Sequence, residues 1–195
     1  MKTIKYFLLV ATALLLTTTG CSNKDSEFYN DVFVKSPDLV AFNYDNVAKS
    51  INVTADIPRL LNEQGQPNQL DIYRSTGGAT RLDFSYVIEK QVDANNWANY
   101  EVADSQIALV RGEGYSAGPY IVASSLYNAS NQTYEFKAGI HSLPAGSYRL
   151  SFGYNSTSTT DVEFRSESEN NQLFLNLNSA SSLLDGGGFY TFTVN

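Results

Sequence analysis

The stretch Arg81-Leu82-Asp83-Phe84-Ser85-Tyr86-Val87-Ile88-Glu89-Lys90 decides the fold of this chain. Apolar and polar side chains alternate through its first half, and a period of two is the pattern of a β-strand with one buried face. The alternation places Asp83 on the solvent side of that strand. A polar turn at residues 93–96 leads into a second strand-like run at 97–102, so the segment predicts an antiparallel hairpin.

Similar short runs recur on both sides of this hairpin, with turn residues between them. They cover residues 39–44, 50–57, 69–74, 105–110, 119–123, 132–136, 147–154, 161–165, 172–177 and 189–194. The thirteen tyrosines and eleven phenylalanines also favour strands over helices. The pattern predicts an all-β fold, an antiparallel β-sandwich or barrel of about 8–10 strands.

We expect residues 37–195 to form a single β-sandwich domain, because no charge run or proline-rich linker divides them. Two small sandwiches meeting near Ala103 are the alternative. Each half would then be small for an independent core without disulfides.

The segment 143–148, Leu-Pro-Ala-Gly-Ser-Tyr, resembles the tyrosine corner of immunoglobulin-like and fibronectin-like sandwiches. Similar proline-glycine-tyrosine entries into a strand occur in jelly-roll carbohydrate-binding modules. The resemblance implies an immunoglobulin-like or jelly-roll topology. It also implies that the Tyr148 hydroxyl binds the backbone just upstream, which is a structural role.

The N-terminus reads as a secretory signal peptide at residues 1–20. Lys2 and Lys5 precede an apolar run at residues 7–16, and small residues then lead to Cys21, the only cysteine. The apolar run is shorter than the roughly 20 residues of a membrane-spanning helix. A single cysteine excludes an intramolecular disulfide.

Gly20-Cys21 resembles the lipobox of bacterial lipoproteins, although Thr18 stands where a leucine-like residue is usual. The resemblance implies that Cys21 is lipidated and that this covalent lipid attaches the protein to a membrane. Residues 21–36 would be a flexible, lipidated tether. Lys24, Asp25 and Glu27 resemble the charged signal that sends lipoproteins to the cell surface in Bacteroidota-type bacteria; an ordinary spacer is the alternative. The expected location is the outer membrane or cell surface.

The charge of the chain limits its partners. The formal net charge is −7, and removal of residues 1–20 with their two lysines leaves about −9. Nucleic-acid binding needs clustered Lys and Arg, so it is excluded as a function. Docking on anionic lipid by charge is excluded for the same reason.

Catalytic and metal-binding constellations are sparse. His141 is the only histidine, and no Gly-x-Ser-x-Gly motif supplies a hydrolase nucleophile. Carboxylates on or beside predicted strands are explained by solvated strand faces; they are Asp71, Asp83, Glu89, Glu135, Asp161 and Glu163. The loop after Asp185 offers one carboxylate and is better interpreted as a connection, with a structural calcium as the less favoured alternative. We therefore expect no enzyme activity, no cofactor and no metal.

The most unusual loop is Gly112-Glu113-Gly114, followed by Tyr115 and Tyr120. Aromatic side chains there, or Trp97 and Tyr100 at the hairpin, are candidates for stacking on a sugar ring. The sequence thus favours a non-catalytic binding module for a glycan or protein ligand. The alternative is a structural or assembly component such as a fimbrillin-like surface subunit. A hydrolase is the less favoured third class.

Overall fold

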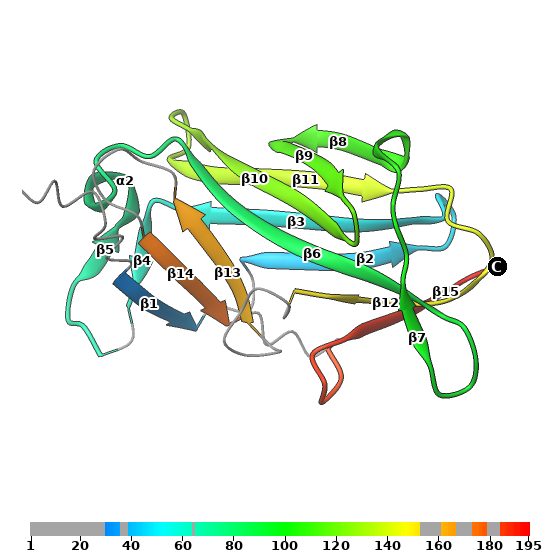
Figure 1. Cartoon of the computed structure of the whole chain (residues 1–195). Helices are drawn as coiled ribbons and strands as arrows, with labels where there is room; N and C mark the ends of the chain where they lie inside the picture. The colour runs from blue at the N-terminus through cyan, green and yellow to red at the C-terminus, as the bar shows by residue number, and fades with distance from the viewer. Residues whose placement is uncertain (1–29, 36–38, 64, 153–160, 167–172, 179–183) are drawn as a thin grey trace, which may run out of the picture.

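The computed structural model describes residues 30–35, 39–63, 65–152, 161–166, 173–178 and 184–195. These residues form an all-β structure with little helix, which confirms the predicted class (Figure 1). The strands are β1 (Asn30–Lys35), β2 (Val40–Asp45), β3 (Ser50–Pro58), β4 (Leu60–Asn62), β5 (Gln69–Asp71), β6 (Arg81–Gln91), β7 (Trp97–Asn99), β8 (Ile107–Arg111), β9 (Glu113–Ala117), β10 (Tyr120–Asn128), β11 (Thr133–Ile140), β12 (Gly146–Ser151), β13 (Asp161–Ser166), β14 (Leu173–Asn178) and β15 (Tyr190–Val194). The helical pieces are α2 (Ile72–Ser75) and η1 (Asp104–Gln106).

Strand β6 is the strand that all parts of the large sheet share. One of its edges pairs with β10 and then with β7, and its other edge pairs with β13 and then with β12. Val87 shows the division, since it pairs with Tyr120 on one side and with Ser151 on the other. In Figure 1, β13, β14 and β1 therefore extend from the start of β6, and β12 and β15 extend from its end.

The large sheet is strongly curved, so that its two end strands, β15 and β2, approach each other. The result is a sandwich that is nearly closed into a barrel. Its order runs β15-β12-β6-β10-β11-β3-β2. At the closing side, the Tyr44 backbone N–H donates to the Tyr190 hydroxyl at 3.0 Å, and the Tyr44 ring stacks on Phe192. In the core, the rings of Phe84 on β6 and Phe136 on β11 pack edge to face. The buried apolar side chains form one cluster inside this curl.

Gly112 lies where β10 and β11 separate. These strands pair only near their hairpin turn, and beyond it β9 pairs with β10 while β8 pairs with β11. The chain passes from β8 to β9 through this single residue, at a φ of +78°. A Cβ at Gly112 would lie 2.5 Å from the Ser124 carbonyl oxygen and 2.9 Å from the Phe136 ring. Only glycine fits this crossing.

Three segments differ from the sequence-based expectation. Residues 30–35, expected in the tether, form β1, which pairs in parallel with β14 and buries Val32 and Val34. The expected strand at 69–74 ends at Asp71, because the Asp71 side chain accepts from the Arg74 N–H and caps α2. The glycine-rich loop after Gly112 contains strand β9. The structure accordingly has fifteen strand segments in its described part, more than about 8–10, because several are short.

The Tyr148 side chain makes the type of contact that the tyrosine-corner resemblance implies. Its hydroxyl donates to the Pro144 carbonyl oxygen at 2.7 Å, and its ring is fully buried. Burial raises the pKa of Tyr148 to about 12, so the hydroxyl remains a donor across the neutral range. The contact fixes the turn at residues 143–146 onto the start of β12.

Replacement of Gly112 by alanine should lower the free energy of unfolding by about 3 kcal/mol, because the new methyl group meets the backbone of Ser124. Gly118→Ala is the matched control. Gly118 also has a positive φ, +62°, but nothing lies within 4 Å of its Cβ position, so only about 1 kcal/mol of backbone strain is expected. Urea denaturation measures both; equal losses would show that no clash exists at Gly112.

Tyr148→Phe should cost about 1 kcal/mol of stability, because the Pro144 carbonyl loses its donor. Tyr86→Phe is the control. The Tyr86 hydroxyl is buried and has no hydrogen-bond partner within the described residues, so its removal should be neutral or stabilising. Thermal and urea unfolding should show a larger loss of stability for Tyr148→Phe than for Tyr86→Phe. A larger loss for Tyr86→Phe would contradict the assignment of Tyr148.

Candidate ligand-binding face

The outward face of β13, β6, β10 and β9 carries side chains in rows across the strands. Pairing aligns Arg165, Asp83, Ser124 and Glu113 in one row. Because successive side chains alternate in a strand, residues two positions along lie on the same face. The next row therefore contains Ser85, Val122 and Tyr115, and the row after it contains Val87, Tyr120 and Ala117.

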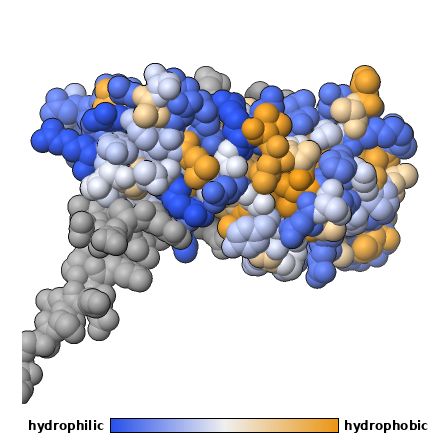
Figure 2. Space-filling model, turned by 90° about the horizontal axis from the view of Figure 1, so that it is seen from above, coloured by the Kyte–Doolittle hydropathy of each residue, from blue (hydrophilic) through white to orange (hydrophobic). Residues whose placement is uncertain are grey.

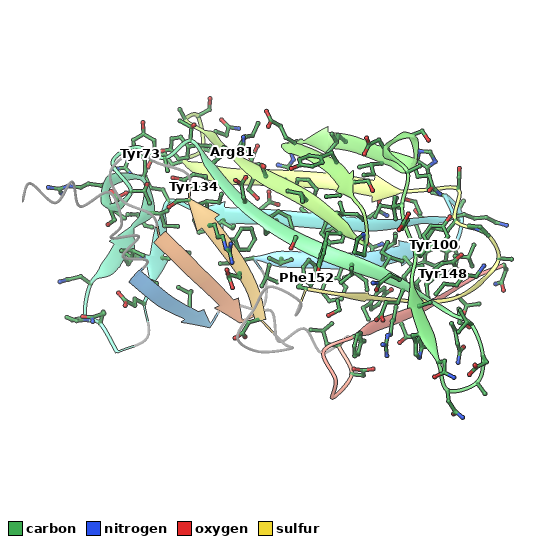
Figure 3. All side chains as sticks on the ribbon, in the orientation of Figure 1. Tyr73, Arg81, Tyr100, Tyr134, Tyr148 and Phe152 are labelled. Atoms are coloured by element: carbon green, nitrogen blue, oxygen red, sulfur yellow. The ribbon has the colours of Figure 1, made fainter. Side chains whose placement is uncertain are left out.

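The polar row is held by ion pairs and hydrogen bonds. The Arg81 guanidinium lies 2.9 Å from Asp83 Oδ1 and 3.6 Å from Glu113 Oε2. The Ser124 hydroxyl donates to Asp83 at 2.5 Å and accepts from Arg81 at 2.7 Å. Figure 3 shows Arg81 near the start of β6. These contacts fix the positions of the polar side chains in the row.

A hollow of about 160 Å³ opens beside this row. The lining residues are Asp83, Phe84, Ser85, Val122, Glu163 and Arg165. It lies where the partner edge of β6 changes, because β13 pairs with Leu82 and Asp83 whereas β12 pairs from Val87 onward. The hollow thus brings together two carboxylates, a hydroxyl, a guanidinium and two apolar residues.

The two carboxylates of the hollow come from strands far apart in the chain. Arg165 Nε donates to Glu163 Oε1 at 2.7 Å, and the Glu163 side chain is only 9% exposed. Asp161 begins the same strand, and its burial raises the pKa of that carboxyl. Sequence alternation identified Asp83 and Glu163 as outward-facing residues; only the pairing of β6 with β13 brings them to the same hollow.

Tyr115 and Tyr120 lie on this face, next to the hollow. Tyr115 is 55% exposed and stands directly opposite Val122, which lines the hollow. Tyr120 is half-buried two residues before Val122 on β10. Both aromatic residues selected from the glycine-rich loop therefore share one surface with the polar row.

Trp97 begins β7, which pairs with the end of β6, and it is half-buried beneath an arginine. The Arg149 guanidinium carbon stands 4.8 Å from the centre of the Trp97 ring and 3.7 Å from that of Phe189. Its Nε donates to the buried Glu89 carboxylate at 2.7 Å. The ring face of Trp97 is thereby occupied by Arg149, which supports a packing role.

Tyr100 is turned toward the core. Its ring packs edge to face on Tyr148 with 5.7 Å between centroids. Both residues lie near the end of β6 in Figure 3. The structure thus separates the four aromatic residues that the sequence suggested: Tyr115 and Tyr120 lie together, whereas Trp97 and Tyr100 have other contacts.

The remaining sequence candidates make local contacts. His141 Nδ1 lies 2.9 Å from the hydroxyl of its neighbour Ser142. Asp185 accepts from the N–H groups of Gly187 and Phe189 in a turn. No group of three or more His, Cys, Asp or Glu side chains in the described ranges is placed to hold a metal ion.

The described ranges also contain no helix of the length and hydropathy that a bilayer crossing requires.

An apolar area adjoins the candidate face. Leu109 and Val110 on β8 are 45% and 66% exposed. Seen from above, apolar side chains gather in patches among polar ones on the side where β8 and β9 lie (Figures 1 and 2). Leu109 and Val110 therefore add exposed apolar surface at the β8 edge of the sheet.

No family model, curated protein or solved structure matches this chain.

Arg149→Met should lower the free energy of unfolding by about 3 kcal/mol, because Glu89 then remains buried without its partner. The double variant Glu89→Gln/Arg149→Met should lose less, since no unpaired charge is left. Urea denaturation of both variants and of Glu89→Gln completes a double-mutant cycle. A double variant less stable than Arg149→Met would contradict this role of the pair.

Proposed function

We propose that this chain is a lipid-anchored protein of the cell envelope whose β domain is a non-catalytic binding module for glycans. The observation that carries the proposal is the position of Tyr115. Its exposed ring stands opposite Val122, which also lines the hollow with Asp83, Ser85, Glu163 and Arg165.

A sugar ring needs two kinds of contact, and this face supplies both. The C–H face of the ring packs on an aromatic side chain, which Tyr115 provides. The hydroxyl groups at the edge of the ring need hydrogen-bond acceptors and donors, which the carboxylates and guanidinium of the hollow provide. Strands lie about 4.8 Å apart, so β9 and β6 are separated by about 10 Å. That span suits a short oligosaccharide better than a single sugar.

Attachment to the membrane is proposed through a lipid on Cys21. The support is the signal-peptide pattern before it and the lipobox resemblance of Gly20-Cys21. The acidic chain lacks the basic clusters that would bind anionic lipid by charge. More than one acyl chain would make the attachment stable.

A structural or assembly role is the second proposal, because the sheet has edges that its own described strands leave unpaired. β8 pairs only with β11, and β1 pairs only with β14. The exposed Leu109 and Val110 on β8 favour contact with another chain. Hydrolysis has weaker support, because Asp83 and Glu163 in the hollow are both engaged by arginines.

Tyr115→Ala should weaken glycan binding about 3- to 10-fold, because the stacking surface is lost. Affinity gel electrophoresis against a panel of polysaccharides measures this change. Val110→Ala is the control; Val110 is also exposed but lies on β8, which pairs with β11 and not with β9, so this variant should bind like the wild type. Binding that is indifferent to Tyr115, or absent with every polysaccharide, would overturn the glycan proposal.

Cys21→Ser should move the protein from the membrane fraction to the soluble fraction, because the lipid acceptor is removed. Fractionation of cells producing each form, followed by immunoblotting, measures the distribution. Ser22→Ala is the control and should remain with the membrane. Continued membrane association of Cys21→Ser would contradict the anchor.

A further inference from the structure

The charges around the hollow point to the class of glycan. Asp83, Glu163 and Glu113 contribute three carboxylates to the face, against the two guanidinium groups of Arg81 and Arg165. The net charge of these five side chains is therefore −1. Asp161, at the start of β13, adds a further acidic group to this strand. A chain with net charge −7 reinforces the local balance at long range.

Both guanidinium groups already hold carboxylates. Arg81 bridges Asp83 and Glu113, and Arg165 holds Glu163 at 2.7 Å. An anionic ligand would have to displace one of these carboxylates to form a bidentate pair. Glu163 lines the hollow, and its side chain is only 9% exposed. Separating it from Arg165 would leave a largely buried charge without a partner, which opposes binding.

Neutral sugars meet none of these obstacles. Their hydroxyl groups can donate to the outer lone pairs of the paired carboxylates without breaking an ion pair. Their C–H faces can lie on Tyr115 and Val122. We infer that this face selects neutral, hydroxyl-rich oligosaccharides and rejects glycans that carry carboxylate or sulfate groups. This inference rests on the proposed glycan-binding function.

The test is affinity gel electrophoresis of the mature chain with Cys21 replaced by serine. The probes are a neutral β-glucan, a neutral galactomannan, polygalacturonate and heparin. At least one neutral polysaccharide should retard the protein, and the acidic ones should bind about tenfold more weakly or not at all, because like charges repel. Retardation by an acidic polysaccharide equal to or above that by both neutral ones would overturn the inference but keep the proposed function. Lack of retardation by all four would overturn both.

Charge variants test the cause of the selection. Asp83→Asn/Glu163→Gln changes the balance of the face from one negative to one positive charge, so it should gain retardation by the acidic polysaccharides, most strongly at low salt. Glu63→Gln/Glu101→Gln removes the same number of carboxylates outside the hollow and should show no gain.

Glu113→Gln gives a second variant that leaves the hollow itself intact. Its side chain is 61% exposed, so folding should be unaffected, and a smaller gain in the same direction is expected. Circular dichroism verifies the fold of each variant. Absence of any gain in folded Glu113→Gln, together with equal behaviour of the two double variants, would overturn the electrostatic cause.

Discussion

The pairing of β6 along both edges is the constraint on which the rest of the structure depends. The strand is long enough for two partners on each side, so a single element joins β13 and its neighbours to β12 and β15. Its inward side chains, including Phe84 and Tyr86, are buried in the shared core. Its outward side chains therefore have fixed positions on a rigid strand, as a binding site requires.

The change of partner along β6 also creates the hollow. β13 and β12 pair with the same edge of β6 at different places and leave residues 84–86 between the two pairings, where Phe84 and Ser85 line the hollow. On the opposite edge, β10 brings Val122 beside Ser85, and β9 adds Tyr115. β9 reaches this position because Gly112 lets the chain cross between β10 and β11. The glycine-rich segment thus serves the fold first, and it places the exposed aromatic ring as a consequence.

Local patterns in the sequence predict much of this fold. Alternation locates β3, β6, β13 and β15 closely, because each has one face in the core. It does not reveal which strands pair, since register depends on contacts between distant segments. The parallel pairing of β1 with β14 and the division of β6 between its partners are of this kind. The same limit applies to the candidate face: the sequence identifies Tyr115, Asp83 and Glu163 separately, and only the pairing of strands places them on one surface.

The most direct measurement is a titration of the isotope-labelled domain with a neutral oligosaccharide, followed by the backbone amide signals in two-dimensional NMR spectra. The account predicts that the largest shifts fall on β6, β9, β10 and β13 around Ser85, Val122, Tyr115 and Glu163, with small shifts at Trp97 and Tyr100. Shifts centred on β7, or confined to the exposed β8 edge, would contradict the account.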